Sequence, residues 1–182
     1  MIKKENEFII SFSGMKEGIH EFNYLIDSSF FSMIENSMYE NGNIKVILTL
    51  NKTIQMLILN FNIVGTVSSI CDKCLEEMDI PFQCEEKIYV RFGEEYDEPS
   101  EDVIILPFGE HELDVSKIIY DLIITSLPIR HIHDLDKKGN SKCNPEMLKK
   151  IREYSVNELH SGNDKKKQTD PRWNALKKII EK

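Results

Sequence analysis

The chain has 182 residues, 41% of them hydrophobic and 30% charged, and a formal net charge of −8. This length suits one domain with an appendage, and the apolar content is too high for a wholly disordered chain. No apolar run approaches the ~20 residues of a membrane-spanning helix, and residues 1–7 lack the apolar segment of a signal peptide. Four cysteines without an export signal indicate reduced thiols, so we expect a cytoplasmic protein without a membrane partner.

The charges are distributed unevenly along the chain. Residues 137–182 contain 13 lysines and arginines against 6 acidic residues, whereas residues 1–136 contain 10 against 25. We therefore expect an acidic domain over 1–136 and a basic tail with a short terminal helix over 137–182. The tail's positive charge fits a polyanionic partner, and it equally fits a tail that folds back on its own acidic domain.

The first half of the chain is rich in strand patterns. Phe8–Phe12 and His20–Ile26 alternate between apolar and polar residues, which predicts that they pair as an antiparallel hairpin. Apolar residues four apart predict a short amphipathic helix over Ser28–Tyr39. Ile44–Leu50 and Leu57–Ile63 then alternate again and predict two further strands.

The second half mixes strands with one clear helix. Phe82–Phe92 and Val103–Phe108 predict strands, and the acidic span 94–102 between them predicts a solvated loop rather than a metal site. Asp114 is placed to cap a helix whose apolar stripe indicates core packing and which Pro128 ends.

Apolar residues become sparse beyond residue 130. Met147–Tyr154 predicts a short helix, a second helix opens at Asp170, and the polar segment Ser161–Thr169 between them reads as a flexible linker. The predicted fold class is α+β. We expect a mainly antiparallel sheet or partly open barrel, with two or three helices and an irregular basic C-terminal tail.

A pair of cysteines separated by two residues is the sharpest local feature. Cys71 and Cys74 have the spacing that places two sulfurs on one side of a tetrahedral zinc ion, which is half a site. His131, His133 and Cys143 are candidates for the other half, and we select Cys71, Cys74, His133 and Cys143 as the predicted Zn²⁺ ligands. Two other interpretations stay open, namely structural thiols without a metal and a redox dithiol.

Catalytic motifs are missing from the sequence. It contains no phosphate-binding glycine loop, no Gly-x-Ser-x-Gly and no His-Glu-x-x-His. We therefore expect a binding or assembly role rather than an enzyme with a small-molecule substrate. Cys84 shares the alternation of its apolar neighbours, which predicts a small hydrophobic core residue.

The C-terminal segment combines a helix start with an apolar stripe. Asp170 and Pro171 are typical of a first helical turn, and Trp173, Leu176 and Ile180 recur at helical spacing. A helix of about 11 residues is marginal alone, so this stripe needs a surface, either on its own domain or on a partner. The candidate partner-binding residues are Lys165, Lys166, Lys167, Arg172 and Trp173.

The order of these features resembles the YceD-like family, the large ribosomal RNA subunit accumulation proteins. The features that carry the resemblance are the strand-rich half before Cys71-x-x-Cys74-Leu75-Glu76, the acidic loop, Leu113-Asp114-Val115, Leu127-Pro128-Ile129, Gly139 with Cys143-Asn144-Pro145, and Asp170-Pro171-Arg172-Trp173 with Leu176. Many members carry a second cysteine pair where this chain has His131, His133 and a single Cys143. That departure bears on metal binding, although histidine can replace cysteine as a zinc ligand.

The resemblance implies a non-enzymatic role in 23S rRNA accumulation and large-subunit assembly. The partner would be rRNA, a ribosomal protein of the large subunit or a pre-50S particle. The alternative is a small zinc- or redox-responsive cytoplasmic binding protein unrelated to ribosomes. Salt-dependent binding separates the two, because an RNA contact weakens steeply as salt rises.

Overall fold

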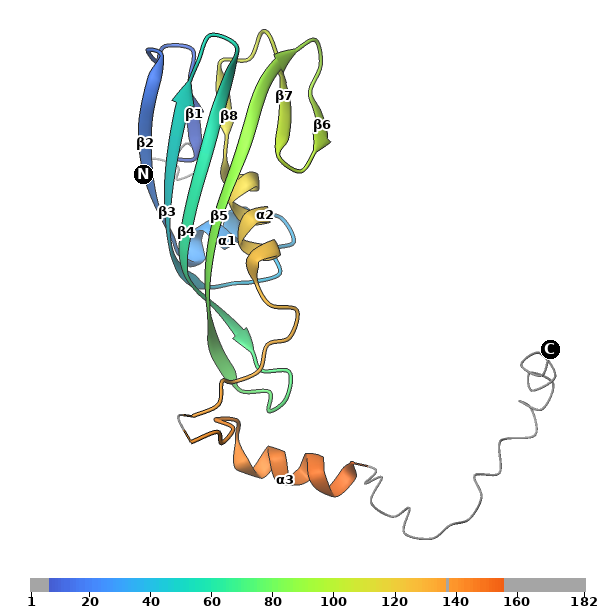
Figure 1. Cartoon of the computed structure of the whole chain (residues 1–182). Coiled ribbons are helices and arrows are strands. Elements are labelled where there is room, and N and C mark those ends of the chain that lie inside the picture. Colours follow the sequence, from blue (N-terminus) through green and yellow to red (C-terminus); the bar gives the residue numbers. More distant parts are fainter. Residues whose placement is uncertain (1–6, 137, 156–182) are drawn as a thin grey trace, which may run out of the picture. The chain divides into compact units, whose positions relative to one another are not determined.

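The computed structural model describes residues 7–136 and 138–155. Over these residues the chain forms strands and helices in the order shown in Figure 1. The elements are β1 (Ile9–Ser11), β2 (Gly18–Ile26), α1 (Ser28–Met33), β3 (Gly42–Lys52), β4 (Met56–Ile70), β5 (Glu77–Gly93), β6 (Asp97–Ser100), β7 (Val103–Pro107), β8 (Glu112–Asp114), α2 (Ser116–Ser126) and α3 (Pro145–Tyr154).

Six strands form one open sheet in the order β2-β3-β4-β5-β7-β6. Neighbouring strands are antiparallel except β5 and β7, which run parallel, and β1 and β8 form a separate two-stranded sheet. The predicted α+β class is therefore confirmed, in its open-sheet rather than its barrel form. The chain divides into two compact units, the first ending at Asn144 and the second beginning at Pro145. The predicted division at residue 136 stays a prediction.

The predicted pairing of the first two strands is wrong. β1 pairs with β8 rather than with β2, so that Ile10 lies opposite Leu113. β2 instead pairs with β3 along its whole length. The alternation itself was informative, because Phe8, Ile10 and Phe12 are all buried. Alternation shows which side chains face the core, but it does not identify the strand on the other side of the hydrogen bonds.

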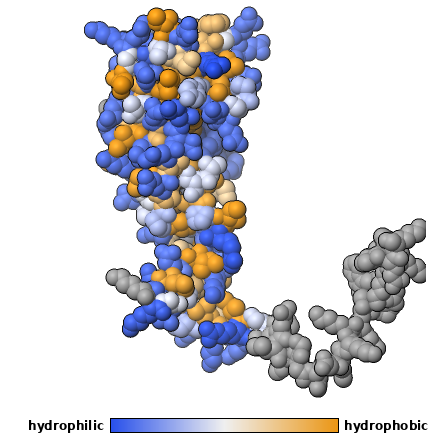
Figure 2. Space-filling view, in the orientation of Figure 1, coloured by the Kyte–Doolittle hydropathy of each residue, from blue (hydrophilic) through white to orange (hydrophobic). Residues whose placement is uncertain are grey.

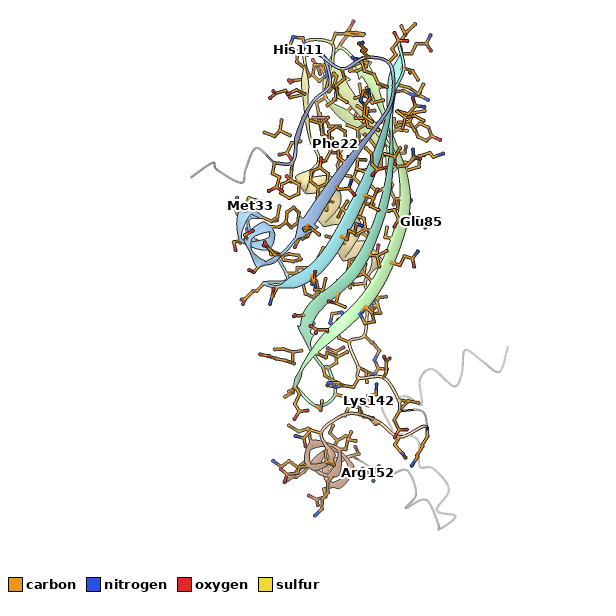
Figure 3. The ribbon with its side chains drawn as sticks, turned by 90° about the vertical axis from the view of Figure 1, so that its left-hand side faces the viewer. Phe22, Met33, Glu85, His111, Lys142 and Arg152 are labelled. Carbon is orange, nitrogen blue, oxygen red and sulfur yellow. The ribbon has the colours of Figure 1, made fainter. Side chains whose placement is uncertain are left out.

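One face of the large sheet packs on the core. Among the described residues of the first unit, no helix covers the other face. Figure 3 shows the sheet from its edge, with Met33 of α1 on one side and Glu85 of β5 on the other. Alternate residues of the three central strands are buried on the covered face. They are Ile44, Val46, Leu48 and Leu50 of β3, Leu57, Leu59, Phe61 and Ile63 of β4, and Ile80, Phe82, Cys84, Ile88 and Val90 of β5. The prediction that Cys84 is a core residue is thereby confirmed.

Two predicted boundaries differ from the structure. The first helix ends at Met33 instead of continuing to Tyr39, because Ile34 is extended and Asn36 takes a left-handed conformation with φ of 59°. Asparagine tolerates that conformation better than most residues, which suits the chain reversal here. The acidic span 94–102 is also not entirely a loop, since β6 forms within it and pairs with β7. The side chains of β6 are exposed, in agreement with the predicted solvated segment.

Helix α2 lies against the sheet and leads the chain toward the candidate site. The structure places the N-cap of this helix at Val115, one residue after the predicted Asp114. The Asp114 carboxylate nevertheless accepts a hydrogen bond from the backbone N–H of Ser116, the first helical residue, at 2.8 Å. Ile119 and Ile123 are fully buried, and each such burial contributes roughly 1.5–3 kcal/mol. The helix ends at Ser126, just before Pro128.

The second unit contains the predicted helix at Met147–Tyr154, which the structure places at Pro145–Tyr154. None of the helices formed by the described residues is long and apolar enough to cross a membrane. Figure 2 shows a face on which hydrophilic side chains predominate and hydrophobic ones are scattered among them.

Candidate metal centre

The two spaced cysteines lie in the loop that joins the long strands β4 and β5. These strands pair up to Ile70 and Glu77, so the loop begins and ends at adjacent positions of a regular hairpin. Within the loop, the backbone N–H of Cys71 donates to the carbonyl of Glu76, and the N–H of Leu75 donates to the carbonyl of Cys71, both at 2.9 Å. Cys71 is 0% exposed and Cys74 is 3% exposed, so both thiols lie inside the loop.

The loop backbone is bent so that its amides point at sulfur. Leu75 adopts a left-handed conformation with φ of 61°, which costs roughly 1–2 kcal/mol for a residue with a side chain. The N–H of Glu76 that follows it reaches the Cys74 thiol. A strained residue directly after the second cysteine indicates that the loop is built to hold sulfur in one place.

Backbone amides also change the acidity of Cys71. Burial alone would raise the pKa of its thiol, but N–H groups of Cys74, His133 and Lys73 hydrogen-bond the sulfur and lower the pKa to about 6. Burial raises the pKa of Cys74. Of these two thiols, Cys71 is therefore the one that favours the thiolate at neutral pH.

A second loop returns Cys143 to the neighbourhood of His133. The Asp136 carboxylate accepts hydrogen bonds at 2.8 Å from the backbone N–H groups of Lys138 and Asn140, and Asp136 N–H donates to the Asn140 carbonyl at 2.7 Å. Beyond this turn, Leu135 and Ser141 form an antiparallel bridge. Short polar side chains thus close a tight reversal, which is why His133 and Cys143 lie together despite nine intervening residues.

The four residues selected from the sequence form one cluster in the structure. One ligand atom from each of Cys71, Cys74, His133 and Cys143 lies within 4.8 Å of all the others. The Sγ atoms of Cys71 and Cys143 are 3.8 Å apart, and Cys74 Sγ is 3.4 Å from His133 Nδ1. Tetrahedral zinc with bonds of about 2.3 Å to sulfur and about 2.1 Å to nitrogen would separate two sulfur ligands by about 3.8 Å, and a sulfur from a nitrogen ligand by about 3.6 Å. The cluster could therefore hold a metal ion with little rearrangement.

The neighbouring histidine is turned away from this cluster. Nδ1 of His131 lies 3.0 Å from Ser69 Oγ, and its Nε2 lies 3.4 Å from the Tyr39 hydroxyl. Both ring nitrogens thus have polar partners on the first unit. Of the two histidines that the sequence offered, the structure brings only His133 to the sulfurs.

Sequence reasoning missed the residue that joins these segments. Asp72 N–H donates to the His131 carbonyl at 2.7 Å, and the Asp72 carboxylate accepts from His131 N–H at 2.7 Å. The only sequence signal for Asp72 is its place between the two cysteines.

Some sequence predictions lie outside the described residues. They are the helix that begins at Asp170 and the candidate partner-binding residues Lys165, Lys166, Lys167, Arg172 and Trp173.

Comparison with known proteins gives one result that covers most of the chain. No curated protein and no solved structure matches the chain. A family model described as large ribosomal RNA subunit accumulation protein YceD matches residues 59–180. The matched region begins in β4 and includes all four residues of the cluster, α2, α3 and the lysine-rich and tryptophan-containing segments beyond them. Because the match extends over well more than half of the 182 residues, the chain belongs to the family of the large ribosomal RNA subunit accumulation protein YceD.

Proposed function

We propose that this chain is a non-enzymatic factor that supports 23S rRNA accumulation and large-subunit assembly by binding a precursor of that subunit. The observation that carries the proposal is the family match over residues 59–180, because the family is described by large-subunit rRNA accumulation. The geometry of the cluster agrees with a binding protein. Three cysteines and one histidine supply four protein ligands, which is the closed ligand set of a structural zinc site.

Zinc is the metal that we assign to the cluster. Thiolates are soft ligands that favour zinc over calcium, magnesium or manganese, and a compact tetrahedral S₃N set suits zinc geometry. When bound, the ion would join three segments: the β4–β5 loop, the segment after α2 and the loop that ends at Cys143. Its role would be to fix the end of the first unit.

We assign the RNA contact to the basic C-terminal residues. Residues 1–136 carry 25 acidic residues against 10 basic ones, so their net negative charge repels phosphate. A hollow of about 1020 Å³ between β5, β6 and α2 illustrates this, because Glu86, Glu101, Asp102 and Asp121 line it. Residues 137–182 have the opposite charge balance, and Lys165, Lys166, Lys167, Arg172 and Trp173 are the proposed contact residues.

Sedimentation on sucrose gradients tests the proposal. Tagged protein from growing cells should migrate with particles lighter than the mature 50S subunit, and this association should weaken steeply as salt rises. Replacing Lys165, Lys166 and Lys167 by glutamine should reduce it, whereas the same change at Lys16, Lys45 and Lys117 of the first unit should not. Protein that remains at the top of the gradient at low salt would overturn the proposal.

Two observations favour a second candidate function, a redox-responsive binding protein. The sulfurs of Cys71 and Cys143 lie 3.8 Å apart, and the lowered pKa of Cys71 favours its reactive thiolate. Zinc release at low peroxide concentrations, in a protein that never sediments with ribosomal particles, would support this candidate instead.

A further inference from the structure

We propose that Asp72 and His131 are positioning residues of the metal site, which hold His133 against the two cysteines of the β4–β5 loop. The inference rests on the zinc assignment made above and adds to it a cause for the arrangement of the ligands. Neither residue contributes a ligand atom to the cluster.

The contact between the two residues is reciprocal. Asp72 N–H donates to the carbonyl of His131 at 2.7 Å, and His131 N–H donates to the Asp72 carboxylate at the same distance. One amino acid of the Cys71–Cys74 loop therefore uses both its backbone and its side chain on a single residue of another segment. Two hydrogen bonds between the same two residues fix relative orientation as well as distance, which one bond would not.

The imidazole of His131 anchors the same segment at a third point. Its Nδ1 lies 3.0 Å from Ser69 Oγ of β4, and its Nε2 lies 3.4 Å from the hydroxyl of Tyr39, which follows α1. The ring of Tyr39 also packs against this imidazole, with centroids 6.1 Å apart. The main chain and the ring of His131 are thus both held by the body of the first unit.

This anchoring of His131 bears directly on His133, the proposed histidine ligand. His133 is two residues beyond His131, and its Nδ1 is 3.4 Å from Cys74 Sγ. If His131 were free, the metal would have to order this segment itself, and that entropic cost would appear as weaker binding. Partners that orient metal ligands from outside the coordination sphere typically change affinity by 10–100-fold. The occupied nitrogens of His131 also explain why it does not compete with His133 as the ligand.

The test measures metal binding by the full chain. Zinc affinity is obtained by competition with a chelator of known affinity, and the ligand set is monitored through the visible bands of the Co²⁺-substituted protein. Asp72→Ala should weaken zinc binding 10–100-fold and leave the energies of the cobalt bands unchanged, since the four ligands stay the same. Asp79→Ala is the matched control, because Asp79 also lies in the β4–β5 hairpin and accepts a hydrogen bond from Ser68 without touching His131. The zinc affinity of the Asp79→Ala variant should remain within twofold of that of the original chain.

A double-mutant cycle shows whether Asp72 acts through His133. His133→Ala should shift the cobalt bands, because it removes a ligand, and adding Asp72→Ala to it should cost little further affinity. An equal loss from Asp72→Ala with and without His133 would overturn the proposal, as would an Asp72→Ala affinity within twofold of the original. Cobalt bands in His131→Ala that match those of His133→Ala would identify His131 as the ligand and also overturn it. If the unaltered chain binds neither metal, the zinc assignment fails and this inference fails with it.

Discussion

Cys71 and Cys84 are both buried cysteines, yet their substitutions should have different consequences. Cys71→Ser removes a proposed zinc ligand, and zinc at 1,000 times its dissociation constant contributes about 4 kcal/mol to the folded state. Cys84→Ala only shortens a core side chain and should cost on the order of 1–2 kcal/mol. Elemental analysis and thermal unfolding of the purified variants measure both effects.

The unaltered protein and Cys84→Ala should each retain about one zinc per chain, whereas Cys71→Ser should lose it and melt at a lower temperature. A chain that contains no zinc after expression in zinc-rich medium would contradict the assignment.

The Cys71 thiol should also titrate with a lowered pKa in the metal-free protein. Its pKa in the folded chain is about 6, below the ordinary value of 9.0, because backbone amides stabilise the thiolate. A thiol whose pKa is lower in the folded chain than in the unfolded chain stabilises the fold. This contribution is fully present above the pKa of the unfolded chain and is lost as pH falls through about 6. Thiolate absorbance at 240 nm should therefore rise near pH 6, and Cys71→Ser should lack this step. The absence of thiolate below pH 8 in the unaltered chain would show that the amides do not have this effect.

At the scale of single residues, the sequence predicted the four members of the cluster but not the reason for their arrangement. The spacing of Cys71 and Cys74 carried the prediction, since it matches a known ligand geometry. Spacing does not separate His131 from His133, because the distinction depends on Ser69 and Tyr39, which are distant in the sequence. The contribution of Asp72 arises from a tertiary contact and has no sequence pattern of its own.

At the scale of elements, the long β4–β5 hairpin carries the loop with Cys71 and Cys74, and Gly65 of β4 allows β3 to pass close to β4. A Cβ atom on Gly65 would overlap the carbonyl oxygen of Asn43 and lie 2.6 Å from the Cα of Ile44, both in β3. Gly65→Ala should therefore destabilise the fold by about 1–3 kcal/mol, because backbone rather than a flexible side chain must move. Chemical denaturation measures the change.

Gly14→Ala is the control for this substitution, because a Cβ there meets nothing within 4 Å and its φ is not left-handed. It should change stability by less than about 0.5 kcal/mol. Equal stabilities of the two variants would show that β3 and β4 can separate at Gly65 without cost.

Strand positions were more predictable than strand partners. Alternation located the buried faces of β3, β4 and β5 because hydrophobic burial is a local property of each strand. The pairing of β1 with β8 joins segments about 100 residues apart, which no local pattern encodes. The predicted first helix is longer than the observed one for a related reason. Its apolar spacing continues past Met33, but the chain there turns so that Met38 N–H can donate to the hydroxyl of Tyr120.

At the scale of the whole molecule, the acidic first unit and the basic C-terminal residues should separate functionally. Truncation after Gly162 removes Lys165–Lys167 and the segment with Trp173. If that segment serves a partner, truncation should leave the melting temperature nearly unchanged and abolish association with ribosomal precursors. If Trp173 instead packs on its own protein, truncation should cost ~3–5 kcal/mol, because a large buried side chain is lost.

Tryptophan fluorescence distinguishes these outcomes without a partner, because Trp173 is the chain's single tryptophan. A red-shifted emission maximum in the free protein supports the partner arrangement, and a blue-shifted maximum in the isolated monomer contradicts it.

The ratio of 23S to 16S rRNA in cells that lack this protein tests the central claim most directly. We predict that the ratio falls on deletion, most visibly when subunit assembly is slow, and that the full-length gene restores it. The Cys84→Ala variant should restore it equally well, whereas a variant with Cys71 and Cys74 both changed to serine should restore it poorly. An unchanged 23S to 16S ratio in the deletion strain, with an unchanged subunit profile during slow assembly, would contradict the account.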